Sequence, residues 1–431
     1  MNAKIPPVAS ASRGVAMNVL ERAECLLDAG SSGNMNFTVI ASYCGRLELR
    51  VLQEALAALQ AEHLLLRSTL LWEGDHPHFG PAAAPVPVAL LPWPGDDDPE
   101  GAARAWKPAA RASLAERFGG GGDPLWRISW LQGPQAGELL LTFHHAIADG
   151  LSAMALVQQL FALLAASDAS AQEERQDHWD AFSPDLSRSF AGPRPPAAAV
   201  QELSDRQDIG LSTSYGLEQL NASASRALLA WTRQRGLRLN ATLHAAFLQA
   251  LVAAEVVPAQ TVATTVVNLR PLATPAMPWE LMRLLRVCVE TPVSVDPDEP
   301  VERLATELHG VLQQQLRQGD PLQALDSIAA ALHDDPTPQQ FWRRSWRQGG
   351  LITNLGRVPV GARHGDLTLQ RLFFVANVEP IALPDRPLAV LGAMSFNDQL
   401  SLTCLHIEQQ LDDPGAAAVL ADMKRRLLLL V

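Results

Sequence analysis

Apolar side chains recur along this chain with two different periods, and each period predicts one kind of secondary structure. Where they return every third or fourth residue the pattern predicts an amphipathic helix, and short runs rich in Val, Ile, Thr and Phe predict strands. Residues 80–101, rich in Pro, Ala and Asp, predict an irregular loop or an edge strand. In the N-terminal part the predicted helices are 15–27, 49–63 and 151–165, and the predicted strands are 36–43, 66–72, 125–131 and 138–144.

The same two periods continue through the C-terminal part of the chain. Because strands and helices are mixed in both parts, we predict an α/β protein of two sandwiches, each with helices covering a mostly mixed sheet. The predicted helices are 223–235, 240–254, 300–318 and one that begins near 413, and the predicted strands are 261–268, 286–295, 350–354, 368–378, 388–395 and 399–407.

A segment without sustained periodicity separates the two parts. Residues 171–212 are rich in Ser, Asp, Ala and Pro, which is typical of an interdomain linker. The chain length of 431 residues also fits two domains of about 200 residues each. We therefore expect an N-terminal lobe at 1–170, a linker at 171–212 and a C-terminal lobe at 213–431.

The composition limits the classes of function. Hydrophobic residues make up 48% and charged residues 19%, which predicts a globular protein. A net charge of −12 opposes nucleic-acid binding, which gains affinity by neutralising phosphates. The four cysteines are scattered without the spacing of a metal site, so we expect reduced thiols. Because no apolar run is long enough to span a bilayer and no signal-peptide pattern occurs, we expect a cytoplasmic protein without stable membrane insertion.

A pair of histidines stands where a predicted strand runs into a predicted helix. Side chains alternate along a strand, so His144 and His145 point to opposite faces and cannot converge on one metal ion. We therefore predict no metal site. Asp149 and Gly150 lie where the helix begins, and an Asp in this place commonly caps the first turn. From the residues alone, structural roles for the histidines and for Asp149 remain open beside a catalytic one.

The segment 144–150, His-His-Ala-Ile-Ala-Asp-Gly, resembles the HHxxxDG motif of the condensation domains of nonribosomal peptide synthetases. It also resembles the motif of the polyketide-associated acyltransferases that esterify phthiocerol, and it is similar to the signature of bacterial wax ester synthases. Chloramphenicol acetyltransferase has a related His-Asp motif. Further segments extend the resemblance over almost the whole chain, namely 62–70, which is similar to RHxxLRTxF but begins with Glu62, and 123–127, 267–271 and 353–357.

This resemblance implies a fold and an activity. The expected fold is two chloramphenicol acetyltransferase-like α/β sandwich lobes in a V-shaped arrangement, with the active site in a tunnel between them. The expected activity is transfer of an acyl group from acyl-CoA or a phosphopantetheinylated carrier protein to a hydroxyl acceptor, in secondary-metabolite or lipid biosynthesis. No cofactor is expected to be bound permanently. Two alternatives are a free-standing condensation enzyme that acylates an amine, and a non-catalytic member that binds a carrier protein. The altered Glu62 position, and the absence of recognisable peptide-bond-forming motifs in the second lobe, favour the ester.

The resemblance also implies roles for the motif residues. His145 is the expected general base, and a neutral imidazole with a pKa near 6.5 suits that task at neutral pH. Asp149 is expected to form a structural ion pair with Arg67. His144 is expected to shape the local backbone, and Gly150 to give the turn freedom and leave room beside the catalytic ring.

Two further groups of residues are weaker candidates. Asn354 is a candidate oxyanion donor, and Asn268 and Arg270 are candidates for the tunnel wall, although turn formation and capping explain such residues equally well. The cluster of Arg343, Arg344 and Arg347 is a candidate docking site for the phosphate-bearing donor or an acidic carrier protein. Its alternative is a solvated helix face with extended arginines.

Overall fold

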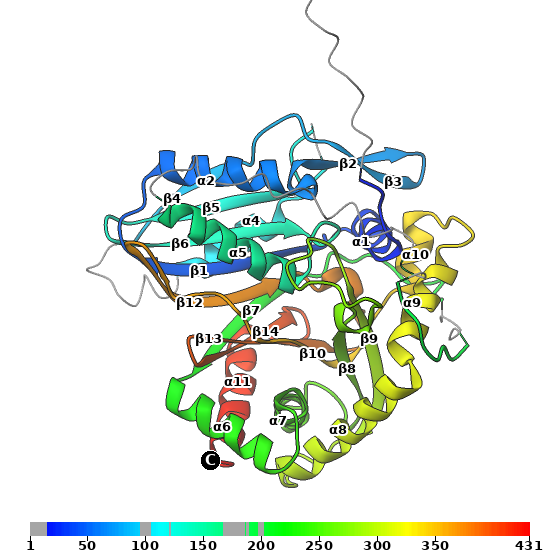
Figure 1. Ribbon diagram of the computed structural model, residues 1–431. Coiled ribbons are helices and arrows are strands. Elements are labelled where there is room, and N and C mark those ends of the chain that lie inside the picture. The colour runs from blue at the N-terminus through cyan, green and yellow to red at the C-terminus, as the bar shows by residue number, and fades with distance from the viewer. Residues whose placement is uncertain (1–14, 95–104, 120–121, 167–185, 187–188, 197–201) are drawn as a thin grey trace, which may run out of the picture.

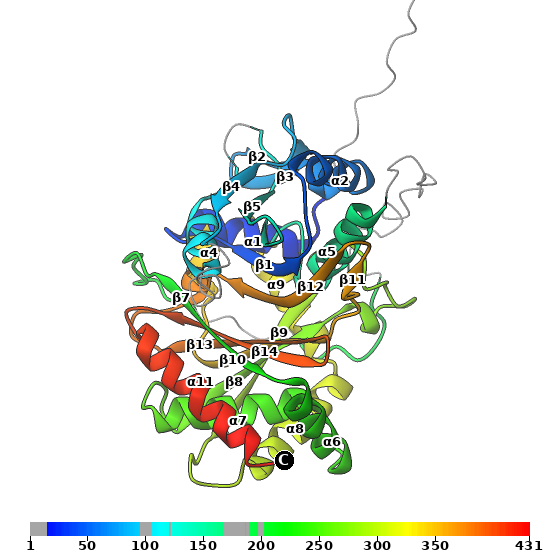
Figure 2. The ribbon, with the colours of Figure 1, turned by 90° about the vertical axis from the view of Figure 1, so that its left-hand side faces the viewer.

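The computed structural model describes all residues except 1–14, 95–104, 120–121, 167–185, 187–188 and 197–201, and its strands form two large sheets. Figure 1 shows the two lobes, one above the other, each built around a six-stranded sheet. Figure 2, turned by 90° about the vertical axis, shows the two sheets stacked one above the other. No helix among the described residues combines the length and apolar character needed to cross a bilayer.

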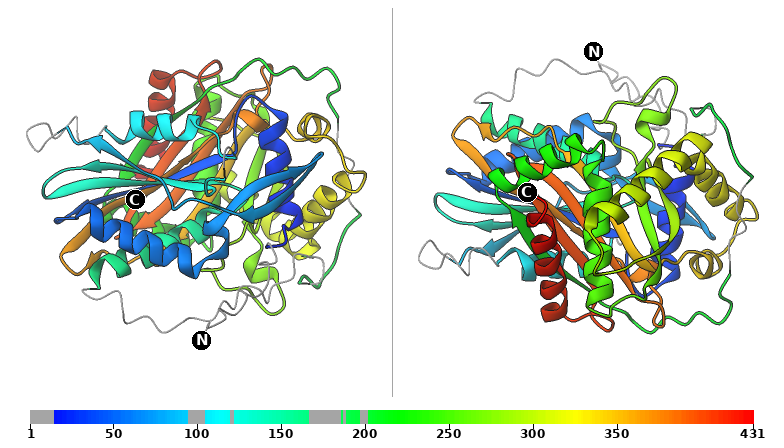
Figure 3. Two further views of the ribbon diagram at one scale, coloured as in Figure 1. Left: turned by 90° about the horizontal axis from the view of Figure 1, so that it is seen from above. Right: turned by 90° about the horizontal axis from the view of Figure 1, so that it is seen from below.

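The first sheet has helices on both faces. Its strand order is β11-β12-β1-β6-β5-β4. Figure 3 shows α2 and α5 on one face and α4 on the other. Along β1 the side chains alternate, so that Val39 packs with α2 and α5 while Ile40 packs with α4, as the strand period requires. The bounds are β1 Asn36–Cys44, α2 Leu49–Glu62, β4 Val88–Pro92, α4 Trp106–Ala115, β5 Trp126–Gln132, β6 Ala136–His144, α5 Gly150–Ala165, β11 Arg363–His364 and β12 Leu367–Ala376.

The second sheet is covered by helices on the face turned away from the first lobe. Figure 3 shows α6, α7, α8 and α11 on this face when the molecule is seen from below. The strand order is β7-β14-β13-β10-β8-β9, with β10 parallel to both β13 and β8. The bounds are β7 Thr213–Leu220, α6 Ala222–Gln234, α7 Leu239–Ala253, β8 Gln260–Asn268, β9 Arg286–Ser294, α8 Val301–Gln318, β10 Gly349–Arg357, β13 Leu388–Phe396, β14 Gln399–Ile407 and α11 Asp413–Leu428.

Smaller elements connect the two lobes at one side. Helix α1 packs against α10 and α9, which brings the start of the chain beside its second half (Figure 1). A hairpin of β2 and β3 follows the short helix η1. The bounds are α1 Val19–Gly30, η1 Leu64–Arg67, β2 Ser68–Glu73, β3 His76–Pro81, α9 Asp320–Ala331 and α10 Pro338–Arg344.

Two strands from the second half of the chain belong to the first sheet. Residues 213–431 were expected to form the C-terminal lobe, yet β11 and β12 complete the first sheet, where β12 pairs with β1 from Phe37 to Cys44. Without β12, the central strand β1 would expose a row of unpaired backbone groups. Phe373 and Val375 of β12 also share a core with Leu351 and Val390 of the second sheet. Most of the expected linker 171–212 lies outside the described residues, so that boundary remains a prediction.

Candidate active site

The histidine motif lies at the junction between β6 and α5, as the sequence pattern predicts. β6 ends at His144, which is paired with Asn36 of β1, and the backbone N–H of His145 donates to Met35 O at 2.8 Å. Asp149 is the N-cap of α5, and its Oδ1 accepts from the N–H of Ser152 at 3.0 Å. The predicted cap therefore exists, and it holds the motif loop rigidly at the end of the sheet.

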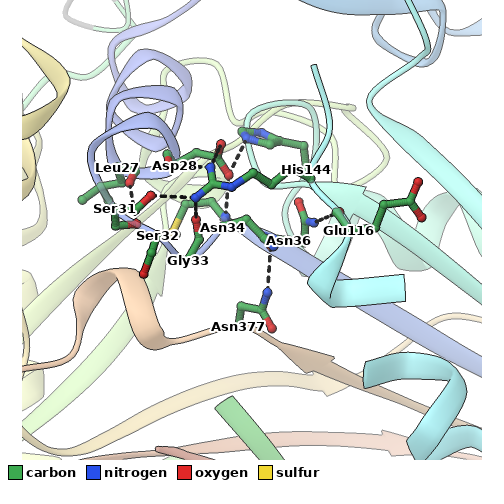
Figure 4. A network of polar contacts seen from close by, with 12 residues as sticks. Leu27, Asp28, Ser31, Ser32, Gly33, Asn34, Asn36, Glu116, His144 and Asn377 are labelled. Atoms are coloured by element: carbon green, nitrogen blue, oxygen red, sulfur yellow. Dashed lines mark hydrogen bonds and ion pairs between the residues drawn. The ribbon is translucent and has the colours of Figure 1, made fainter. Parts of the chain in front are cut away.

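The two imidazoles point in different directions, and His144 points away from the cavity described below. Its Nδ1 accepts from the N–H of Ala146 at 3.0 Å, so the proton of the neutral ring belongs on Nε2, which lies 3.5 Å from Asp28 Oδ1. Figure 4 shows His144 and Asp28 turned toward each other. Burial acts to raise the pKa of Asp28, but His144, the N–H of Met35 and Arg117 outweigh it and hold that pKa below its usual value. His144 thus ties β6 to α1.

His145 lines the cavity described below, and one of its two ring nitrogens is engaged by the backbone. Its Nδ1 lies 3.2 Å from the carbonyl oxygen of Ala148 and donates to it, which leaves the lone pair on Nε2. The ring stacks on Phe37 with 4.4 Å between centroids. Burial, followed by the positive charge of Arg286, lowers the pKa of His145 to about 3. The imidazole is therefore neutral and oriented at neutral pH, and its pKa lies well below the value near 6.5 expected from the sequence.

A cavity of about 250 Å³ lies between the two lobes beside His145. The first lobe contributes Met35, Phe37 and Phe374 to its wall, and the second contributes Val266, Leu351 and Leu405. These apolar side chains exclude water and suit an acyl chain.

The ion pair of the motif differs from the expected one. Asp149 was expected to pair with Arg67, but it forms a two-pronged pair with Arg270, at 2.6 Å (Nη1 to Oδ2) and 3.1 Å (Nη2 to Oδ1). Arg270 and Asp149 are both buried, whereas Arg67 is exposed at the end of η1. Burial acts to raise the pKa of Asp149, but the guanidinium of Arg270 and the backbone N–H groups of Ser152 and Leu285 hold that pKa below its usual value. The pair joins the two lobes.

Gly150 lies close to a side chain of the second lobe. A Cβ at this position would lie 2.8 Å from Cδ2 of Leu355, which belongs to β10. Both residues line the cavity. A side chain at position 150 would therefore require the Leu355 side chain to move, and the predicted role of Gly150 beside the catalytic ring remains a prediction.

Two family models match the chain, one in its first half and the other in its second half. The model described as "Condensation domain" matches residues 25–186, which include the histidine motif. The model described as "Phthiocerol/phthiodiolone dimycocerosyl transferase C-terminus" matches residues 212–405, which include Arg270. The chain therefore combines a condensation domain with a C-terminal domain of the phthiocerol/phthiodiolone dimycocerosyl transferase type. The resemblance predicted from residues 144–150 is thereby confirmed.

Solved structures confirm the predicted two-lobed fold at low sequence identity. Polyketide synthase associated protein 5 from Mycobacterium tuberculosis superposes with a TM-score of 0.63 at 16% identity, over 96% of this chain and 98% of its own. The TRI3 trichothecene 15-O-acetyltransferase from Fusarium sporotrichioides gives 0.67 at 12% identity, over 98% and 96%. The starter condensation domain of rhizomide synthetase, solved with C8-CoA and Leu-SNAC, gives 0.63 at 16%, over 97% and 94%. Among curated proteins, none has a matching sequence.

In this condensation-domain protein, the two candidate asparagines line the cavity and also shape turns. Asn354 Oδ1 accepts from the N–H of Gly356 at 2.8 Å, and Asn268 Oδ1 accepts from the N–H of Arg270 at 3.0 Å. Both line the cavity, as Arg270 does. The oxyanion role of Asn354 remains a prediction, since these bonds occupy only the amide oxygen.

The arginine cluster lies at the end of α10 and just beyond it, and none of its three arginines lines the cavity. Arg344 Nη2 pairs with Glu202 at 3.1 Å, and Arg347 Nε lies 3.4 Å from Glu290. Arg343 is half-buried beside the buried ring of Trp342. Two of the three charges thus have carboxylate partners, and the docking role remains a prediction.

Two residues of the site were missed at the sequence level. Phe37 supplies the ring beneath His145, and Arg286 is a charged residue in the cavity wall. Nothing in the sequence indicated a role for Phe37, because it is one apolar residue among others in a predicted strand. Arg286 could have been noticed, because it is a lone positive charge in the apolar run 284–289. No neighbouring residue in the sequence, however, indicates that it lies near His145.

Proposed function

We propose that this protein transfers an acyl group from a thioester, carried by CoA or by a phosphopantetheinylated carrier protein, to a hydroxyl group of a small acceptor. The observation that carries the proposal is the neutral imidazole of His145, which keeps a lone pair on Nε2 at the wall of an apolar cavity between the lobes. A base of this kind suits an acceptor that must lose its proton as it attacks.

The chemistry needs two proton movements. As the acceptor oxygen attacks the thioester carbonyl carbon, Nε2 of His145 takes the hydroxyl proton and the carbonyl electrons move onto oxygen. When the tetrahedral intermediate collapses, the carbon–sulfur bond breaks and the thiolate takes the proton from His145. The Nδ1–H donated to Ala148 O and the ring of Phe37 hold the imidazole in one orientation through both steps.

Features of the site and of similar proteins support this proposal. The apolar wall suits the hydrocarbon part of an acyl donor, while the thioester end needs only the base and donors near the reacting carbon. One similar structure is an O-acetyltransferase and another was solved with an acyl-CoA. The ordered cap and ion pair around Asp149 support a working motif over a silent binding module.

The direct test supplies acyl-CoA and acyl-carrier thioesters with paired alcohol and amine acceptors, and follows product by intact mass and free thiol by colour. We expect an ester product and one thiol released for each ester. His309, partly exposed on α8, provides a matched control, because His309→Ala should transfer at the wild-type rate. Amide product alone would identify the protein as an amine-acylating condensation enzyme. Absence of both products would overturn the proposal.

The pH profile of the reaction should reflect the lowered pKa of His145. A free histidine loses half its base form near pH 6.5, but this one keeps it until the pH approaches its own pKa of about 3. We therefore expect kcat/KM to stay level as the pH falls from 8 through 6.5. The profile is measured with a thioester that is stable to hydrolysis over this range. A half-maximal point near pH 6.5 would contradict the expected environment of the ring.

The arginine cluster offers a test of donor docking. If Arg343, Arg344 and Arg347 hold phosphate or an acidic carrier protein, changing all three to Ala should raise the donor KM with little change in kcat, because such binding is equal in ground and transition states. The increase should shrink at high salt, which screens exposed charges. Arg50→Ala, an exposed arginine paired with Glu54 on α2, is the control. An unchanged KM for both donor types at low salt would remove the docking role.

A further inference from the structure

The strands β8 and β9 present polar side chains to the cavity. Asn268 and Arg286 are directly opposite each other in this antiparallel pair, as are Val266 and Cys288, and all four line the cavity. Val287, between them, belongs to a different core on the other side. Because alternate residues of a strand share a face, the register itself directs the Arg286 side chain into the cavity.

A backbone hydrogen bond sets Arg286 beside the catalytic motif. The N–H of the preceding residue, Leu285, donates to Asp149 Oδ2 at 3.1 Å, and Asp149 lies in the same short loop as His145. Arg286 Nη2 donates to Glu24 Oε1 of α1 at 2.8 Å, and Glu24 is buried. The backbone before Arg286 is therefore held by the motif, and its guanidinium is held by α1.

Arg286 differs from the other cation in the cavity wall. Arg270 is buried and its guanidinium is occupied by Asp149 and by the carbonyl oxygens of Leu281 and Arg283. Arg286, by contrast, keeps 25% of its side-chain surface exposed. A guanidinium carries five N–H donors; Glu24 accepts from Nη2 of Arg286, and the side chain of Cys288 is a second partner, so these two neighbours do not use all five. Among the described residues of the wall, Arg286 is thus the cation with donors left for a ligand.

We propose that Arg286 is a catalytic residue that donates to the oxyanion of the tetrahedral intermediate, and that Glu24 is the positioning residue that holds its guanidinium. This inference rests on the proposed acyl transfer. As the acceptor attacks, negative charge appears on the former carbonyl oxygen beside the newly protonated His145. An oxyanion between Arg286 and the imidazolium is attracted to both. A donor held in place before reaction, within an apolar cavity, stabilises such charge strongly.

The test compares variants that remove the charge, keep it, or remove a matched charge elsewhere. Arg286→Met should lower kcat roughly 10²- to 10³-fold with little change in KM, because the oxyanion exists only in the transition state and the intermediate. Arg286→Lys should recover part of that loss, since it retains the charge without the planar fork. The double variant Glu24→Gln/Arg286→Met removes both charges and provides the same readout if Arg286→Met alone is unstable.

The matched control uses the neighbouring ion pair. Arg283, in the segment just before β9, donates from Nε to Glu21 Oε1 of α1 at 2.6 Å, one helical turn from Glu24, and neither Arg283 nor Glu21 lines the cavity. Glu21→Gln/Arg283→Met should therefore keep the wild-type kcat. If it loses as much as Arg286→Met, the effect belongs to packing of α1 on the second lobe, and the inference is overturned.

A second readout separates electrostatics from packing. The charged groups that act on His145 are Arg286 of β9, His144 of β6 and Asp149 at the start of α5, together with the carbonyl of Ala148. Removing the positive charge of Arg286 raises the pKa of His145, so the acid limb of kcat/KM should move to higher pH in Arg286→Met and not in Arg286→Lys. If the acid limb of kcat/KM lies at the same pH in both variants as in the wild type, the proximity of Arg286 to His145 is contradicted.

The remaining outcomes are distinct. An Arg286→Met enzyme with wild-type kcat would overturn the oxyanion role, while active wild type and inactive His145→Ala would leave the proposed function standing. A higher KM only for substrates that carry a carboxylate, with kcat unchanged, would also overturn it and assign Arg286 to substrate binding. A wild-type protein that transfers from no thioester would remove the proposed function and this inference with it.

Discussion

Replacing His145 by Ala is expected to slow acyl transfer roughly 10²- to 10⁴-fold while the protein stays folded, because a general base contributes about that much. The imidazole makes one hydrogen bond, to the carbonyl of Ala148, and one ring contact, to Phe37, that the variant loses. The N-cap at Asp149 and the backbone bond from His145 to Met35 do not involve the ring and remain. The measurement is kcat for the acyl donor that the wild type uses best, beside a thermal melt.

Two variants make the His145 result interpretable. His309→Ala tests the loss of an unrelated histidine and should leave kcat unchanged. His145→Gln keeps a polar side chain of similar length but offers no base at neutral pH, so it should be as slow as His145→Ala. Near wild-type turnover in either His145 variant would remove the catalytic assignment.

Breaking the ion pair between Asp149 and Arg270 should produce the largest loss of stability. Either Asp149→Ala or Arg270→Ala leaves a buried partner without its counter-charge, which costs about 3–5 kcal/mol. Asp149→Ala also removes the N-cap of α5, worth about 1 kcal/mol more. The double variant should cost less than the sum of the two, because residues in contact are coupled. Denaturant unfolding of the four proteins measures that coupling.

The control for this experiment is Arg67, the partner first expected for Asp149. Its side chain is exposed, so Arg67→Ala should change stability by no more than about 0.5 kcal/mol. The stability losses of Arg67→Ala and Asp149→Ala should also be additive in the double variant, because the two residues are not in contact. Additive losses for Asp149 and Arg270, or coupling between Asp149 and Arg67, would contradict the ion pair described here.

The rate of acyl transfer should also fall in the Asp149→Ala variant. Leu285 donates its N–H to Asp149 Oδ2, and Arg286 is the next residue, so loss of the carboxylate loosens both the motif loop and the start of β9. A displacement of about 1 Å in a catalytic group is enough to cost 10²-fold in rate. The loss of activity in Asp149→Ala therefore reflects positioning, since this carboxylate is buried and bonded to protein groups.

The elements that depend on local pattern were predicted correctly, and the short or polar ones were not. Strand 138–144 and helix 151–165 were located to within one or two residues at their ends, because their periodicity is strong. Residues 80–101 contain an edge strand, β4, which was one of the two structures predicted there. Helices α4 and α9 were missed, and so was α10, which with seven residues is too short to show a sustained helical period.

The sequence by itself determined the motif, its position between a strand and a helix, and the divergence of His144 from His145. These follow from chain alternation and capping, which involve neighbours only a few residues apart. Only the tertiary structure decided that Arg270 pairs with Asp149, that β12 completes the first sheet, and that Arg286 faces His145. Each joins residues more than a hundred positions apart. The physical reason is that such contacts depend on how two separately formed layers approach and on the register of their strands, which local periodicity does not specify.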